Sequence, residues 1–229
     1  MSADSCLFRF RQESLGYAGS PVLHELSLEL RRGEKVALLG ESGTGKSTLL
    51  RRLRELRPAE VAWCPQQPGL VPMLSAFHNI YMGRLNRHPF WYNLANLVRP
   101  LAKPKADITA LAAELGLQHQ LWAAAERLSG GQQSRVSLGR ALYQQKPIFI
   151  GDEPVSALDE RQADELLRLV CRRHDTVVLA LHNVEQALTH CTRVVGLREG
   201  RVVLDADSQT LTAAQLHTLY QQHTQYQRR

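Results

Sequence analysis

The sequence predicts an α/β fold with a mostly parallel sheet and helices on both of its faces. Short apolar runs of strand length alternate with amphipathic stretches of helix length along much of the chain, which is the pattern of repeated strand–helix–strand units. Residues 67–127 interrupt this alternation with five prolines followed by a helical pattern. We therefore expect a helical insertion within an α/β core.

The expected elements are taken in chain order. Apolar and polar residues alternate over 7–11 and 26–30, which is typical of half-exposed antiparallel strands. The apolar run at 35–39 ends at a glycine, as a buried strand would, and a helix is expected from residue 46 to about residue 54. Further helices are expected at 107–115, 133–145, 160–173 and 184–189, and further strands at 148–150, 176–181 and 194–197.

The chain has 229 residues, a net charge of +6 and an isoelectric point near 9.4. This balance admits nucleic acid, an anionic lipid surface or an acidic small molecule as a partner. The segment 61–106 contains basic residues and no acid. No apolar run approaches the roughly 18 residues of a membrane-spanning helix, and charge appears too early for a signal peptide. We therefore expect a cytoplasmic protein.

Residues 40–47, GESGTGKS, match the phosphate-binding pattern GxxxxGK[ST] between an expected buried strand and an expected helix. The glycines let successive backbone N–H groups point at phosphate oxygens, and the helix N-terminus adds partial positive charge. Lys46 is expected to bridge the β- and γ-phosphates of ATP, and the Ser47 hydroxyl to ligate Mg²⁺. The expected ATP contacts in this loop are Gly40, Glu41, Ser42, Gly43, Thr44, Gly45, Lys46, Ser47 and Thr48.

Two acids follow the apolar run 148–150 and Gly151. Asp152 is placed to hold the magnesium shell, and Glu153 to polarise the attacking water as a general base. Taken alone, two acids at a strand end are best explained as surface residues. Together with the phosphate-binding loop, they indicate a nucleotide-hydrolysing site.

Residues 128–132, LSGGQ, precede an expected helix, and small residues at a helix N-terminus expose N–H groups to an anion. This segment resembles the signature of ABC ATPases, and the order of loop, signature and acid pair is also similar to theirs. The resemblance covers nearly the whole chain. It implies a P-loop NTPase core in one domain, 1–229, with a RecA-like core at about 1–66 and 133–229 and a helical subdomain at about 67–132.

The resemblance also implies roles for single residues. In ABC ATPases the signature binds the γ-phosphate of ATP held by a second copy, so the chain would work as a head-to-tail dimer with two ATP molecules. The signature residues are Ser129, Gly130, Gly131 and Gln132. The remaining matches are Tyr17 for adenine stacking, Gln66 for contact with Mg²⁺ and water, Asp159 for the segment 156–159 that resembles the D-loop, and His182 for the switch histidine on the γ-phosphate.

Further segments, among them 70–75, 89–91 and 196–200, look like the phosphonate-import ATPases. That implies a bacterial importer on the cytoplasmic face of the inner membrane, with a permease and, indirectly, a periplasmic substrate-binding protein. The segment after Gln66 would receive a short permease helix, with Leu70 and Phe77 in the socket.

The alternative is a non-transport accessory of a soluble phosphonate-degrading or nucleic-acid complex. A nucleic-acid partner is disfavoured, because the chain has one cassette and no room for a long coiled coil between loop and signature. The chain departs from the family at 51–61, which runs almost directly into residue 62, so the antiparallel β subdomain should be trimmed. A second departure is Gly151, where a small residue would let another group pack close.

Overall fold

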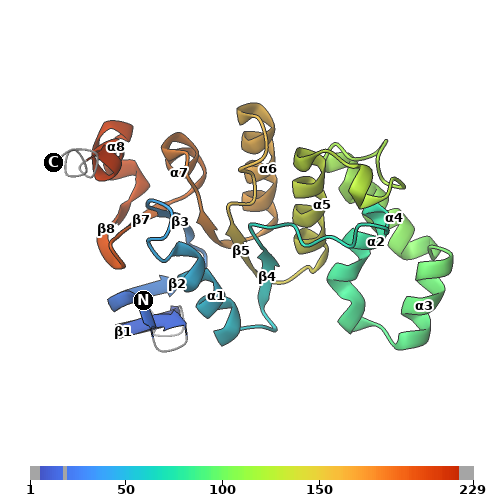
Figure 1. Cartoon of the computed structure of the whole chain (residues 1–229), viewed down its shortest axis with the longest axis horizontal. Helices are drawn as coiled ribbons and strands as arrows, with labels where there is room; N and C mark the ends of the chain where they lie inside the picture. Colours follow the sequence, from blue (N-terminus) through green and yellow to red (C-terminus); the bar gives the residue numbers. More distant parts are fainter. Residues whose placement is uncertain (1–5, 18–19, 222–229) are drawn as a thin grey trace.

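The computed structural model describes residues 6–17 and 20–221 of the chain, and a six-stranded sheet lies at its centre (Figure 1). The strand order is β4-β5-β6-β3-β7-β8. All neighbouring pairs are parallel except β7 and β8. The strands are β3 (Lys35–Leu39), β4 (Val61–Cys64), β5 (Ile148–Asp152), β6 (Thr176–Ala180), β7 (Arg193–Arg198) and β8 (Arg201–Asp207). The predicted, mostly parallel sheet is confirmed.

The two faces of the sheet are covered differently. Helix α1 (Lys46–Leu56) and the antiparallel hairpin of β1 (Cys6–Tyr17) and β2 (Ser20–Arg31) pack on one face. The opposite face carries α5 (Gly130–Tyr143), α6 (Glu160–Arg173) and α7 (Val184–His190). Alternate residues of β3 enter the two clusters, since Leu38 lies on the α1 side and Leu39 on the other. The buried strands are therefore apolar throughout, as expected for a sheet covered on both faces.

The insertion predicted in the middle of the chain is helical and lies beyond α5, at one end of the molecule (Figure 1). Helix α2 packs on α5, where the missing side chain of Gly139 leaves room for Ile80 and Leu115. The elements of the insertion are α2 (Ala76–Tyr81), η2 (Met82–Arg87), α3 (Phe90–Val98), α4 (Ala102–Glu114) and η3 (Ala125–Arg127). The described chain ends with η4 (Ser208–Thr210) and α8 (Ala213–Gln221). No described helix has both the length and the apolar character needed to cross a membrane.

The connection from α1 to β4 is as short as the sequence predicts. Arg57 organises it: its Nη1 contacts Glu60 Oε1 at 2.6 Å, and its Nε donates to the Leu7 carbonyl at 3.0 Å. The Arg57 carbonyl also accepts the Val61 N–H at 3.1 Å. A single arginine thus joins the end of α1, the start of β4 and the first strand of the hairpin.

One sequence-based expectation is wrong. Phe77 is fully buried and its ring stacks on Trp122 with centroids 4.9 Å apart, so it belongs to the core and not to an open permease socket. Leu70 is partly buried against the same core.

Phe77→Ala is therefore expected to lower the free energy of unfolding by about 3–5 kcal/mol, because it leaves a cavity in a close-packed core. Urea denaturation followed by circular dichroism measures this loss. Phe90→Ala is the matched control, since the Phe90 side chain is 68% exposed and should change stability by only about 0.5 kcal/mol. Equal effects of the two substitutions would contradict the core position of Phe77.

Candidate nucleotide site

The phosphate-binding loop joins β3 to α1, and two of its glycines are required by their surroundings. Gly40 has φ 152° and Gly45 has φ 103°. A Cβ on Gly40 would lie 2.4 Å from the Leu197 carbonyl oxygen, and one on Gly45 would lie 2.5 Å from a methyl carbon of Leu23. Both positions exclude a side chain, so the backbone can turn sharply into the N-terminus of α1.

Lys46 lies inside this turn and is only 5% exposed. Its Nζ donates to the carbonyl oxygens of Gly40 at 2.6 Å and Glu41 at 2.9 Å. Burial lowers the pKa of the Lys46 amine, whereas the carboxylates of Glu153 and Asp152 raise it. The amine is thus held over the loop, where it can exchange carbonyl partners for phosphate oxygens. The adjoining P-loop pocket, of about 150 Å³, is lined by Val22, Ser42, Gly43, Gly45, Lys46, Ser47, Thr48, Gln66 and Glu153.

Asp152 ends β5 and is 3% exposed. Within the described chain its Oδ1 has no hydrogen-bond partner. Burial raises the pKa of the Asp152 carboxyl, while the hydrogen bond from Ser47 and the charges of Arg51 and Lys46 oppose that shift. A buried carboxylate oxygen without a partner is costly, and a hard divalent cation would satisfy it. The residues therefore fit Mg²⁺, for which Asp152, Ser47 and Gln66 are the available ligands.

Glu153 brings two distant segments together. Its backbone has φ 51°, and its N–H donates to the Ala180 carbonyl of β6 at 3.2 Å. Its Oε2 accepts from Gln66 Nε2 at 3.0 Å, and its Oε1 lies 2.5 Å from His182 Nε2. The three residues follow β4, β5 and β6, whose carboxyl ends meet at one edge of the sheet. The residues expected to carry catalysis thus form one network, and their catalytic roles stay a prediction.

The signature segment lies elsewhere in the chain. Ser129 caps α5 through a capping box with Gln132, in which Ser129 Oγ accepts the Gln132 N–H at 3.3 Å and Gln132 Oε1 accepts the Ser129 N–H at 3.0 Å. A Cβ on Gly130 would meet no atom within 4 Å, so this helix end is open. Gly131 lies against Ala157, in the segment that precedes Asp159. Asp159 caps α6 by accepting the Gln162 N–H at 2.9 Å. In the part of the chain that the structure describes, residues 129–132 do not line the P-loop pocket.

Three smaller expectations have different outcomes. Tyr17 ends β1, but its side chain lies outside the described residues, so adenine stacking stays a prediction. Gly151 is closely surrounded as expected, since a Cβ there would lie 3.0 Å from Leu179, Phe149 and Pro154. Sequence reasoning missed Arg51, whose charge acts on Asp152. Its position four residues after Ser47 on the same helix face was the available signal.

Comparison with known proteins identifies the family. Residues 23–156 match the family described as ABC transporter, and this match covers more than half of the 229-residue chain. The chain belongs to the ABC transporter family. ABC ATP-binding proteins are ATPases, and this chain is one of them.

Relatives in this family share the name Phosphonates import ATP-binding protein PhnC. The Pseudomonas putida protein is 35% identical over 96% of this chain and 92% of its own length. The Paraburkholderia xenovorans protein is 37% identical over 88% of this chain and 77% of its own length. The Anaeromyxobacter dehalogenans protein is 38% identical over 90% of this chain, which spans 47% of that relative.

Solved structures of ABC cassettes share the fold. A dimeric bacterial ABC transporter cassette superposes with a TM-score of 0.74 at 22% identity, covering 87% of this chain and 98% of that one. A cassette from a Clostridium perfringens ABC transporter complex has a TM-score of 0.72 at 20% identity and covers 97% of each chain. The chain therefore has the fold of ABC ATPases, as the sequence predicts.

Proposed function

We propose that the chain is the ATP-binding and ATP-hydrolysing subunit of a bacterial importer for a phosphonate or a related phosphorus oxyanion. The observation that carries this proposal is the set of relatives named for phosphonate import, which match most of the chain at 35–38% identity. A lone cassette of this kind would work at the cytoplasmic face of the inner membrane with a permease and, indirectly, a substrate-binding protein.

In the proposed reaction, Lys46 and the loop N–H groups hold the ATP phosphates. Ser47, Asp152 and Gln66 hold Mg²⁺, which neutralises phosphate charge when bound. Glu153 takes a proton from the attacking water, and His182 orients the γ-phosphate. Glu153 contacts Gln66 through one carboxylate oxygen and His182 through the other, and each oxygen keeps a lone pair that can accept the attacking water.

We further propose a head-to-tail dimer in which Ser129, Gly130, Gly131 and Gln132 contact ATP held by a second copy. Support comes from the separation of this segment from the P-loop pocket in one chain, and from the open space at Gly130. A helix N-terminus that is open at Gly130 is suited to receive an anion from another molecule.

The permease is proposed to dock on the helical part, which we assign to about residues 67–132, and α3 supplies the surface. Its polar residues point inward: Asn96 is fully buried, and Asn93 Nδ2 donates to the Leu85 and His88 carbonyls at 3.0 and 3.1 Å. Its apolar residues face outward on one stripe, with exposed fractions of 68% for Phe90, 75% for Trp91, 39% for Leu94, 48% for Leu97 and 81% for Val98.

This arrangement inverts the usual amphipathic helix, whose apolar side faces the core. Leu94 and Leu97 also line an apolar groove of about 240 Å³ between α3 and α2. A contiguous exposed apolar patch marks a contact surface, and an apolar helix in a groove is a common mode of recognition. The exposed Lys103 nearby is suited to acidic permease loops.

Replacing Leu94 and Leu97 by Ser is expected to leave the ATPase rate of the isolated subunit unchanged and to lower both permease co-purification and uptake roughly tenfold. Neither side chain lines the P-loop pocket, and both are exposed on α3. Val203→Ser on β8 is the matched control, since Val203 is 42% exposed. Normal permease assembly in the double variant would place the docking surface elsewhere.

Reconstitution of the subunit with its permease tests the proposed cargo directly. ATP-dependent uptake of phosphonates, with sulfate and a neutral solute as comparison substrates, is the expected result. Co-purification with a soluble phosphonate-processing complex in place of a permease would contradict the importer and favour the accessory role.

A further inference from the structure

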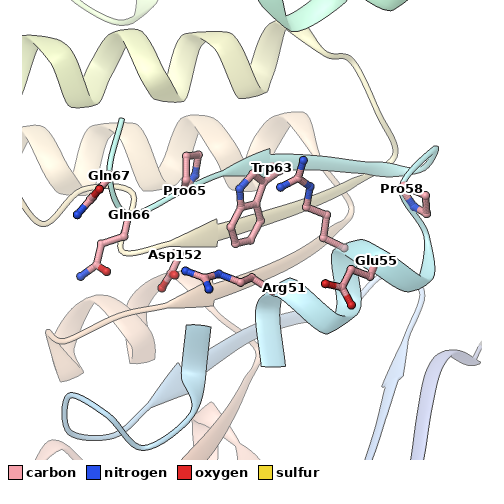
Figure 2. A pocket seen from close by; sticks show the side chains of 9 residues that line it. Arg51, Glu55, Pro58, Trp63, Pro65, Gln66, Gln67 and Asp152 are labelled. Atoms are coloured by element: carbon pink, nitrogen blue, oxygen red, sulfur yellow. The ribbon is translucent and has the colours of Figure 1, made fainter. Parts of the chain in front are cut away.

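A pocket of about 630 Å³ lies beside the P-loop pocket and between α1 and β4 (Figure 2). It shares Gln66 with the lining of the P-loop pocket, and its inner end reaches Asp152, so two of the residues available to Mg²⁺ line it. Arg51 extends from α1 toward Asp152 at the inner end, while Trp63 stands between β4 and α1 (Figure 2). It is therefore a second pocket that opens on the same edge of the sheet, on the side of α1 away from the P-loop pocket.

The short connection between α1 and β4 explains why this space is open. Residues 57–60 form only a turn, so among the described residues no further strand covers the outer surface of α1 here. Trp63 is left half-buried, with the Arg54 guanidinium 5.5 Å from its ring centroid. The Trp63 ring and the Arg54 guanidinium beside it are therefore in contact with solvent, whereas a longer connection would cover them.

The charges around this pocket favour an anion. Arg51 and Arg54 lie one turn apart on α1 and both line it. Lys146 lies at the rim, where its Nζ donates to the Pro58 carbonyl at 2.7 Å. Burial lowers the pKa of the Lys146 amine, and the neighbouring positive charges of Arg54 and Arg87 lower it further. The cations thus lie close enough together to repel one another.

The two acids that line the pocket do not cancel this field. Glu55 lies 3.8 Å from Arg52, a residue that does not line the pocket. Asp152 lies at the inner end, where the charges of Arg51 and Lys46 act on it and where Ser47 donates to it. The outer part of the pocket, around Arg54 and Trp63, therefore presents positive charge.

We infer that the outer part of this pocket, around Arg54 and Trp63, is a binding site for a small phosphorus oxyanion, separate from the ATP phosphates. Arg54 supplies guanidinium donors, which suit phosphate oxygens, and Arg51 adds a second positive charge toward the inner end. The amides of Gln66 and Gln67 supply neutral donors, and Trp63 supplies an apolar wall for an organic substituent. Because Gln66 also bonds Glu153, an occupant can alter the position of the amide that reaches the catalytic network.

The oxyanion has two possible sources. One is inorganic phosphate released by hydrolysis at the adjacent site, and the other is an imported phosphonate in the cytoplasm. Only the second source rests on the proposed function. Phosphate binding to this pocket would be measured on the subunit alone, so a failed uptake experiment would leave that result intact.

Tryptophan fluorescence tests the inference. The chain has three tryptophans, and the exposed Trp91 and Trp122 can be replaced by Phe so that Trp63 is the only reporter. Inorganic phosphate and methylphosphonate are expected to change Trp63 emission saturably without nucleotide. Arg54→Gln should weaken binding roughly tenfold or more, the loss of one charge-assisted contact. Arg161→Gln on α6 removes the same charge from an exposed residue that does not line the pocket and should have no effect.

Lys46→Ala separates the two pockets, since it disables the P-loop and should keep the Trp63 response. A response lost in Lys46→Ala but kept in Arg54→Gln would place the anion in the P-loop and overturn the inference. The inference would also be overturned if sodium chloride at equal ionic strength produced the same change in Trp63 emission, or if phosphate and methylphosphonate produced no change. Tighter methylphosphonate than phosphate identifies the imported cargo as the occupant, and the reverse identifies the hydrolysis product. Calorimetry on the chain with all three tryptophans repeats the comparison if the double Trp variant does not fold.

Discussion

Lys46→Ala is expected to lower ATP affinity roughly a hundredfold or more while leaving the fold intact. Lys46 is the only cation that lines the P-loop pocket among the described residues. Charge-assisted bonds to phosphate contribute about 1.5–3 kcal/mol each, and without them backbone N–H groups alone hold the triphosphate. The substitution also removes the hydrogen bonds from Lys46 Nζ to the Gly40 and Glu41 carbonyls.

Equilibrium binding of a fluorescent ATP analogue measures this change, with circular dichroism as the check on folding. Lys103→Ala is the control, because the Lys103 side chain is 85% exposed on α4 and should not affect nucleotide binding. Near wild-type ATP affinity in Lys46→Ala would contradict the assignment of this loop as the phosphate-binding site for ATP.

Glu153→Gln is expected to lower turnover roughly 10²–10⁴-fold while ATP binding is retained, since an amide cannot take a proton from water. The substituted side chain has the same shape and can still reach Gln66 and His182, so the geometry of the network should be kept. Without hydrolysis, the proposed two-ATP dimer cannot resolve. The variant should therefore accumulate as a dimer in the presence of ATP.

Size-exclusion chromatography with and without ATP measures dimer formation, and phosphate release measures turnover. Two variants serve as controls. Glu185→Gln removes a carboxylate from the start of α7 and should behave like the wild type. Ser129→Arg fills the open end of α5, so it should bind ATP and stay monomeric. A Glu153→Gln protein that binds ATP but remains monomeric counts against the two-site dimer.

Most of the core was predictable because its signals are local. The strands expected at 35–39 and 148–150 are short apolar runs, the second of which extends to Asp152 in the structure, and the helix Glu160–Arg173 was expected at those bounds. Two strands were missed. β4 has only four residues and follows α1 after one turn. β8 lies at the sheet edge with alternating exposed and half-buried residues, so it lacks the apolar run that marks its neighbours.

The helical part was harder to predict because an apolar pattern does not say which side it faces. Phe77 and Leu94 both occur in apolar helical stretches, yet Phe77 is in the core and Leu94 faces outward. The difference comes from partners distant in sequence, such as Trp122 for Phe77. On α3 it comes from Asn93 and Asn96, whose hydrogen bonds hold the polar side inward. The candidate site was easier, since Lys46, Glu153 and His182 each follow an apolar run that indicates a strand, whereas Gln66 follows the missed β4 and was assigned by resemblance alone.

The contacts of Arg57 also affect how α1 and β4 can move. The helix that carries the P-loop lysine and the strand that leads to Gln66 are joined by a four-residue turn, and Arg57 ties both to the hairpin. Such a short connection leaves little freedom for relative motion, so α1 and β4 should move together as one rigid body. A displacement of the phosphate-binding loop by nucleotide would then reach Gln66 from its own strand, in addition to any signal that arrives through Glu153.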